Sequence, residues 1–144
     1  MAALRELMFR GWYWYVSNID KKAEVLFMNY GYSHPNMPVN LEPHDEPNRY
    51  SAQLYHLLGK ATDLKNKDIA EIGSGRGGGL SYIVRTFFPA TAVGVDLDKR
   101  AAKFCNKHYK LKGMSFEQGD AQNLSFLKDN SFDAILNVES SHRY

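Results

Sequence analysis

The feature that most constrains the fold of this chain is a short apolar run that ends in an acid and then in a cluster of glycines. It occupies residues 68–79, with the sequence DIAEIGSGRGGG. Glycine adopts left-handed backbone angles and lets a ligand approach where a Cβ atom would collide. Because Leu80 to Phe88 predicts a helix, the stretch indicates a strand, a turn and a helix arranged around a nucleotide-like ligand.

The charge next to the glycines distinguishes between two ligands. Gly73, Gly75 and Gly78 satisfy the dinucleotide fingerprint, and Asp96 follows Gly75 by 21 positions, near the usual spacing of the acid. However, Glu71 lies two residues before the first glycine, where it would repel the pyrophosphate of NAD. S-adenosylmethionine carries a sulfonium and an ammonium and no phosphate. The acid therefore favours S-adenosylmethionine over NAD.

The amino-acid composition limits which kinds of function this chain can have. With 144 residues and 44% hydrophobic content, the chain suits one sheet-centred domain. A net charge of +2 without a basic run argues against nucleic-acid binding. The single cysteine, Cys105, excludes an internal disulfide and a multi-cysteine zinc site, and the histidines lack metal-ligand spacing, so no metal is expected. Charged residues near the N-terminus argue against a signal peptide or membrane span, so a cytoplasmic protein is expected.

Residues 1–50 predict an N-terminal helical extension and loop. Helices are expected from Ala3 to Ser17 and from Asp20 to Tyr30, whereas four prolines exclude regular structure from Gly31 to Asn48. Aromatic side chains cover too much of the first helix for a single buried face. Three interpretations of this helix stay open: it packs under the main domain, it forms a lid over a substrate pocket, or it rests on a membrane interface.

Residues 51–144 predict one α/β domain. Apolar spacing and turn residues indicate helices and strands in alternation. The helices are expected at Arg49 to Thr62 and Lys99 to Leu111, and the further strands at Thr91 to Val95, Met114 to Gln118 and Phe132 to Val138. Such alternation predicts a Rossmann-like parallel sheet with helices on both faces.

Acids follow the predicted strands at the edge where α/β sheets bind ligands. Asp96 can accept hydrogen bonds from both ribose hydroxyls, or it is a turn acid beside a helix cap at Asp98. Asp120 can bind the amino group of adenine, with backbone amides near Ala121 facing the ring nitrogens, or it caps a turn. Asp133 lies at the opposite end of its strand and is expected to be structural.

Four motifs occur in an informative order. They are EIGSGRG at 71–77, VGVD at 93–96, GDAQNL at 119–124 and SFDAILNVE at 131–139. Together they resemble the class I S-adenosylmethionine-dependent methyltransferases. The segments RGGGLSY at 76–82, NVESSH at 137–142 and MNYGY at 28–32 are similar to small-molecule O-methyltransferases of the phthiotriolone dimycocerosate type.

The resemblance implies S-adenosylmethionine as the cofactor. The residues that it assigns to the cofactor are Glu71, Gly73 and Gly75 for the methionyl part, Asp96 for the ribose, Asp120 and Ala121 for the adenine, and Asn137 beneath the sulfonium. In this interpretation, residues 51–144 form the first half of the family's cofactor-binding domain.

The resemblance also implies methyl transfer to a small lipid-like or polyketide-like acceptor, at a hydroxyl group. A hydroxyl acceptor benefits from a base, and His142 and Glu139 follow the fourth strand near the crevice. His142 is equally compatible with an ordinary loop histidine. Two alternatives stay open: a module that binds S-adenosylmethionine without catalysing transfer and, less favoured, an NAD-dependent oxidoreductase.

The resemblance implies that the last strand of this chain would lie at an open edge of the sheet. The family's sheet continues with three more strands, whereas this chain ends at Tyr144. We therefore expect a domain truncated after its fourth strand, as a fragment of a longer methyltransferase. Alternatively, the open apolar edge is covered by a partner chain or by another copy of this chain.

Overall fold

The computed structural model describes residues 7, 8, 11, 12, 14–16, 20, 23–35 and 38–141. Helices and strands alternate from α2 to β3, as predicted, and β4 follows β3 with no named helix between them. The named elements are η1 (Glu46–Asn48), α2 (Arg49–Gly59), β1 (Asp68–Ile72), α3 (Gly78–Phe87), β2 (Thr91–Asp96), α4 (Lys99–His108), β3 (Met114–Gln118) and β4 (Ala134–Leu136).

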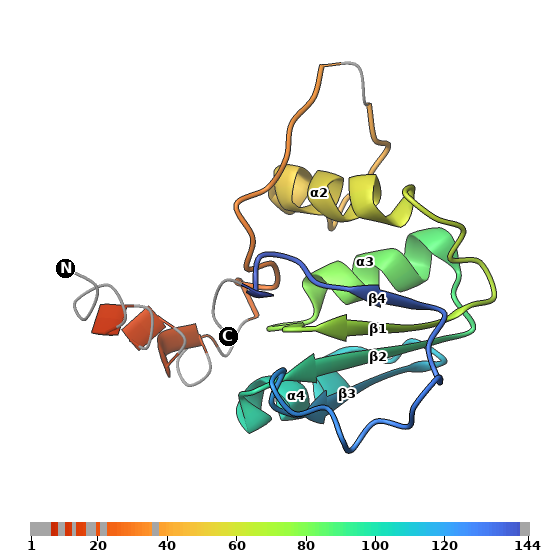
Figure 1. Ribbon diagram of the computed structural model, residues 1–144. Helices are drawn as coiled ribbons and strands as arrows, with labels where there is room; N and C mark the ends of the chain where they lie inside the picture. Colours follow the sequence, from red (N-terminus) through yellow and green to blue (C-terminus); the bar gives the residue numbers. More distant parts are fainter. Residues whose placement is uncertain are drawn as a thin grey trace.

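The four strands form one parallel sheet in the order β3-β2-β1-β4 (Figure 1). In β1, Ala70 lies opposite Val93 of β2 on one side and Ile135 of β4 on the other. Because all strands run in the same direction, their carboxyl ends meet at one edge, which faces the N-terminal segment in Figure 1. The predicted Rossmann-like parallel sheet is confirmed.

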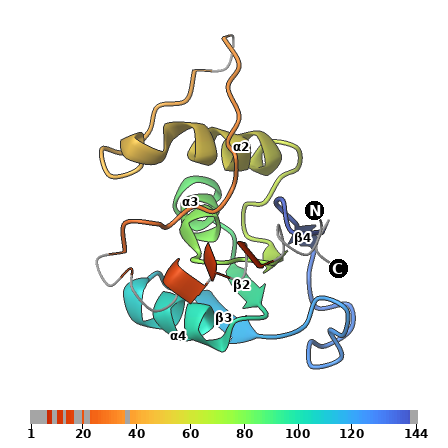
Figure 2. The ribbon, with the colours of Figure 1, turned by 90° about the vertical axis from the view of Figure 1, so that its left-hand side faces the viewer.

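Helices α3 and α4 cover one face of this sheet (Figure 2). The strand register places Glu71 on that face, in one row with Leu136 and Phe116. Ile135 points to the opposite face and is 62% exposed. The sequence predicted helices on both faces, and within the described residues the named helices lie on the face that carries Glu71.

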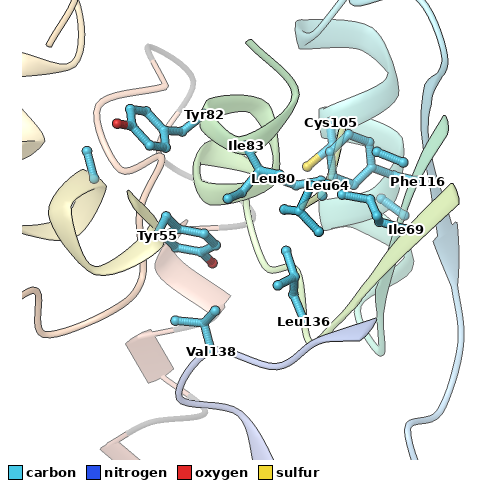
Figure 3. Close-up of a cluster of buried hydrophobic side chains, with 13 residues drawn as sticks. Tyr55, Leu64, Ile69, Leu80, Tyr82, Ile83, Cys105, Phe116, Leu136 and Val138 are labelled. Atoms are coloured by element: carbon cyan, nitrogen blue, oxygen red, sulfur yellow. The ribbon is translucent and has the colours of Figure 1, made fainter. Parts of the chain in front are cut away.

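The hydrophobic core lies between the sheet and these helices (Figure 3). Ile69 of β1, Leu80 and Ile83 of α3 and Cys105 of α4 are fully buried there. Cys105 thus lies in the core, on the helix that was predicted from Lys99 to Leu111. Helix α2 packs on α3 and adds Tyr55, whose ring points inward in Figure 3.

The prediction of a helix from Asp20 to Tyr30 is wrong. Residue 20 and residues 23–30 have no regular structure. The carboxylate of Asp20 accepts hydrogen bonds from the N–H groups of Glu24 and Val25, at 2.9 and 3.0 Å. The backbone of this segment bonds to the glycine loop instead of to its own next turn, because tertiary contacts there outweigh local helix propensity.

In the first predicted helix, Ala3 to Ser17, every described residue is helical. Val16 is buried, whereas Trp12, Trp14 and Tyr15 expose 47%, 55% and 44% of their surface. Burial under the main domain therefore does not account for these three rings. No described helix is long and apolar enough to cross a membrane.

The ends of some elements differ from the predictions. Helix α2 ends three residues early, and the loop at 31–48 contains the short η1 turn. The helix predicted to reach Leu111 ends at His108, because Tyr109 is extended and its hydroxyl donates to the Arg76 carbonyl at 3.0 Å.

Asp133 lies at the amino end of β4, opposite the glycine loop. Its N–H donates to the Asp68 carbonyl at 2.7 Å, and its carboxylate accepts from the Asp68 N–H at 2.9 Å. Strand β4 accordingly begins at Ala134 instead of Phe132. The prediction that Asp133 is structural is confirmed.

Candidate cofactor site

Glycines let the chain turn at the carboxyl end of β1. Gly73 and Gly75 have φ angles of +80° and +53°, in the left-handed region. A Cβ atom on Gly73 would overlap the side chain of Ser140, which follows β4, so only glycine fits there. The N–H groups of Gly73 and Ser74 both donate to the Val95 carbonyl, at 2.8 and 2.9 Å. These bonds hold the loop against the end of β2.

Asp96 orders the same loop from the end of β2. Its carboxylate accepts from the N–H groups of Gly75 and Asp98, at 2.8 and 2.9 Å. Burial raises the pKa of Asp96, and these two bonds act against that shift. Asp98 is the N-cap of α4, as the alternative interpretation expected. Asp96 therefore has a structural role in the loop, and its contact with a ribose stays a prediction.

Glu71 is the buried acid of the site. The Tyr55 hydroxyl of α2 donates to its Oε1 at 2.5 Å, whereas Oε2 has no hydrogen-bond partner in the part of the chain that the structure describes. Burial raises the pKa of Glu71 to about 7; the bond from Tyr55 lowers it and the Asp96 charge raises it. A buried carboxylate with one unpaired oxygen favours a cationic group beside it.

This pKa predicts a pH dependence of stability. Because the folded pKa of Glu71 lies above its ordinary value of 4.5, its protonation stabilises the fold fully below about pH 4.5, and this contribution is lost as the pH rises through 7. Between pH 8 and 5.5 the expected gain is about 2 kcal/mol. Urea unfolding at both pH values should show that Glu71→Gln lacks this gain, whereas equal gains in both proteins would contradict the prediction.

An irregular segment, residues 23–31, crosses the glycine loop, and we call it the strap. The carbonyl of Leu26 accepts from the N–H of Gly78 at 3.1 Å. The sulfur of Met28 lies 3.1 Å from the position that a Cβ atom on Gly75 would take. The strap thus runs past the start of α3 at the carboxyl edge of the sheet, and Figure 2 shows it crossing in front of α3.

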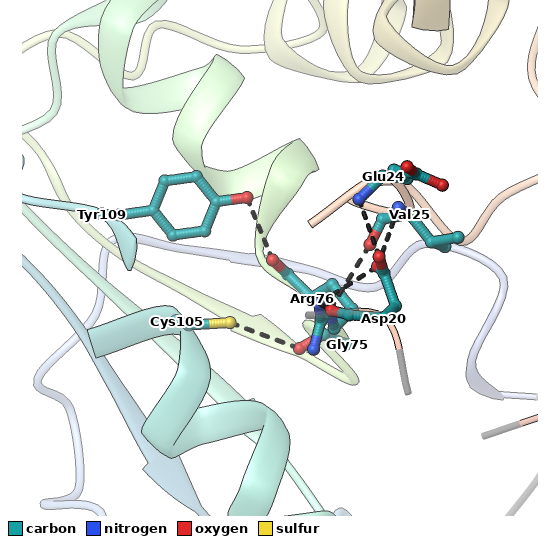
Figure 4. A network of polar contacts seen from close by, with 7 residues as sticks. All are labelled: Asp20, Glu24, Val25, Gly75, Arg76, Cys105 and Tyr109. Atoms are coloured by element: carbon teal, nitrogen blue, oxygen red, sulfur yellow. Dashed lines mark hydrogen bonds and ion pairs between the residues drawn. The ribbon is translucent and has the colours of Figure 1, made fainter. Parts of the chain in front are cut away.

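Arg76 connects the glycine loop to the chain before the strap (Figure 4). Its guanidinium pairs with the Asp20 carboxylate at 3.2 Å and also donates to the carbonyls of Asp20 and Val25, at 3.1 and 3.4 Å. The two paired side chains are only 3% and 5% exposed. The guanidinium also lies 3.4 Å from the ring centroid of Phe104. Arg76 had no role among the residues predicted from the sequence, although a lone arginine among glycines was a usable signal.

The residues after β4 lie beside the same loop. The side chains of Asn137 and Ser140 both donate to the Ile72 carbonyl, at 3.4 and 2.9 Å. Glu139 is exposed and has a positive φ of +53°. Its carboxylate accepts from the N–H of Tyr30 in the strap at 3.0 Å. The structure therefore places Asn137 at the end of β1, and Glu139 holds the far end of the strap.

Asp120 and Ala121 follow β3 at the same edge of the sheet. The exposed carboxylate of Asp120 accepts from the N–H of Gln122 at 2.9 Å, which is the geometry of a turn cap. The contact of Asp120 and Ala121 with adenine stays a prediction. His142, the other candidate base, lies outside the described residues.

A cavity of about 350 Å³ lies against the strap, and none of the predicted cofactor residues lines it. Leu26, Phe27 and Arg85 are among the residues that line it. We place the candidate site at the strand ends instead, because Glu71, Asp96 and the loop glycines converge there. Tyr55 was also missed by the sequence analysis, since only the packing of α2 brings it to Glu71.

Comparison with known proteins identifies relatives of this chain. Residues 70–144 match the model of a methyltransferase domain. The chain is 48% identical to a fatty-acid O-methyltransferase of Mycolicibacterium smegmatis over 133 residues, 92% of this chain and 48% of that protein. It is 43% identical to a phthiotriol/phenolphthiotriol dimycocerosates methyltransferase of Mycobacterium tuberculosis over 138 residues, 95% of this chain and 51% of that protein. The chain thus spans about half the length of the curated relatives it matches.

Solved structures share the fold. A geranyl diphosphate methyltransferase in complex with GPP and sinefungin has a TM-score of 0.61 at 20% identity, over 79% of this chain and 46% of that one. The cyclase SpnF has a TM-score of 0.57 at 18% identity, over 75% of this chain and 39% of that one. Since this fold serves a cyclase as well as a methyltransferase, the likeness shows the fold alone. The sequence match over residues 70–144, more than half of the chain, decides the family: the chain belongs to the methyltransferase domain family.

Proposed function

We propose that this chain binds S-adenosylmethionine and takes part in methyl transfer to an oxygen atom, most simply a hydroxyl, of a lipid-like acceptor. The observation that carries the proposal is the buried carboxylate of Glu71, directly before the glycine loop, one of whose oxygens has no hydrogen-bond partner among the described residues. The names of the two relatives, a fatty-acid O-methyltransferase and a dimycocerosates methyltransferase, support the lipid-like acceptor.

The residues present fit the charges of this cofactor. Oε2 of Glu71 would accept from the ammonium group, whereas a dinucleotide pyrophosphate would be repelled by the same carboxylate. The left-handed backbone angles of Gly73 and Gly75 would turn the loop around the methionyl part. Asp96 would accept hydrogen bonds from the ribose hydroxyls, and Asp120 and Ala121 would bind the adenine.

The cofactor, when bound, supplies a methyl group that is already activated on a sulfonium. The chain's own task is then to align the acceptor and to exclude water. The strap covers the glycine loop, with Met28 against Gly75, and so keeps water from that part of the site. Glu139 or His142 would accept the proton of a hydroxyl acceptor.

Isothermal titration with S-adenosylmethionine, S-adenosylhomocysteine and NAD tests the proposal. We expect the first two to bind and NAD not to bind. At pH 8, Glu71→Gln should weaken the binding of S-adenosylmethionine by about tenfold or more, because a charged partner of the ammonium is lost. Asp129→Asn, which changes an exposed loop acid, is the matched control and should leave the affinity unchanged. Binding of NAD, or of none of the three ligands, would contradict the proposal.

A second candidate is a cofactor-binding module that catalyses only with a further chain. It is favoured by the edge strand β4, which among the described strands pairs with β1 alone and exposes Ile135. Another copy of this chain or a partner chain could cover that edge. Incubation with a fatty acid or a long-chain alcohol and labelled cofactor separates the two candidates. Cofactor binding without a methylated product would favour the module, whereas product formation would exclude it.

A further inference from the structure

We infer that Tyr55 is a positioning residue of the cofactor site, whose hydroxyl fixes the Glu71 carboxylate so that Oε2 is presented to the cofactor's ammonium group. The inference rests on the proposed function and adds a residue from outside the glycine loop. Tyr55 belongs to α2 and Glu71 to β1, and the two are joined by a hydrogen bond of 2.5 Å. Both side chains are buried.

The Tyr55 ring is itself held in place from two sides. A Cβ atom on Gly79 of α3 would overlap this ring, so the ring occupies the space that the glycine leaves. Phe27 of the strap meets the ring edge-on, with centroids 6.1 Å apart. Figure 3 shows the Tyr55 ring directed from α2 towards the core. Because the phenol has little freedom to move, it directs one Glu71 oxygen and leaves the other in a defined place.

Among the described residues, the groups that act on the pKa of Glu71 besides burial are the Tyr55 hydroxyl and the Asp96 carboxylate, whereas the guanidinium of Arg76 acts on the neighbouring Cys105 and Tyr109. Burial and, after it, the charge of Asp96 at the end of β2 raise the pKa of Glu71. Burial, then Glu71 and then Glu139 after β4 raise the pKa of Tyr55. Cys105 of α4 faces Glu71 as a neutral thiol, since burial raises its pKa to about 12. Tyr109, whose pKa burial also raises, faces Tyr55. An ammonium at Oε2 is therefore the partner that would keep Glu71 charged in this environment.

A positioning role has a consequence that simple packing does not have. The hydrogen bond from Tyr55 stabilises the charged form of Glu71, so its loss raises the pKa of that carboxyl further. Cofactor affinity should fall at low pH, when Glu71 takes up a proton. Removing the hydroxyl should then move this fall to higher pH. The cofactor's own amino group titrates near pH 8 in all variants, so it does not affect the comparison.

Titration of S-adenosylmethionine from pH 6 to 8.5 into wild type, Tyr55→Phe and Tyr82→Phe tests the inference. Tyr82 is the matched control, because its hydroxyl lies at the same interface of α2 and α3 but bonds to His56 Nδ1 at 2.9 Å. We expect Tyr55→Phe to shift the fall in affinity by about one pH unit upward, so that binding at pH 6.5 weakens by about tenfold. Tyr82→Phe should follow the wild type.

Proton release on binding provides a second readout. Titrations at pH 6.5 in buffers of different ionisation enthalpy should show that the wild type releases a fraction of a proton as Glu71 becomes fully charged, and that Tyr55→Phe releases a larger fraction, because its Glu71 is more completely protonated before binding. An unmoved pH profile, or an affinity lowered equally at every pH, would overturn the positioning role while the proposed function stands. Failure of the wild type to bind the cofactor would overturn both.

Discussion

Replacing Arg76 with alanine should lower the free energy of unfolding by about 3 kcal/mol, because it leaves the buried Asp20 carboxylate without its cation. The ion pair with Asp20 is almost inaccessible to water, and the same guanidinium stacks on Phe104 and bonds to the Val25 carbonyl. Chemical denaturation of the wild type and Arg76→Ala measures the effect. The strap should also loosen, so its amides should exchange faster with solvent.

The control for Arg76→Ala is Lys67→Ala, which removes a cation from an exposed pair. Lys67 and Asp133 are 46% and 47% exposed and 3.8 Å apart, so the loss should stay below about 1 kcal/mol. Adding Asp20→Ala to Arg76→Ala should recover part of the lost stability, since the stranded charge is removed as well. A loss in Arg76→Ala no larger than in Lys67→Ala would mean that the pair with Asp20 does not hold the strap.

Replacing Asp96 with alanine should weaken the binding of S-adenosylmethionine by about 100-fold or more. The change removes the proposed acceptor of the ribose hydroxyls. It also leaves the N–H groups of Gly75 and Asp98 without the carboxylate that orders the loop. Isothermal titration at pH 8 measures the loss.

Asp96→Asn separates these two effects, because the amide oxygen can still accept from the Gly75 N–H. We expect Asp96→Asn to bind more tightly than Asp96→Ala but more weakly than the wild type. Unchanged affinity in Asp96→Ala would remove Asp96 from the site. Asp96→Asn at wild-type affinity would mean that its charge is not used.

Local sequence patterns predicted most of the fold. The glycine cluster after an apolar run predicted the turn between β1 and α3, because only glycine tolerates the backbone angles and close contacts found there. Alternating apolar spacings predicted the strands and helices after residue 48, with errors only at their ends. The ends depended on contacts such as that between Tyr109 and Arg76, which join residues far apart in the chain.

The sequence by itself determined the parallel α/β fold, the glycine loop and the acids Glu71 and Asp96, since each follows from local backbone preference and charge. Tertiary structure alone decided that the strap forms in place of the predicted helix, because Arg76 and Gly78 donate hydrogen bonds to its carbonyl groups. It also decided that Tyr55 meets Glu71. A hydrogen bond between α2 and β1 depends on how two elements pack in space, and no local pattern in the chain records that distance.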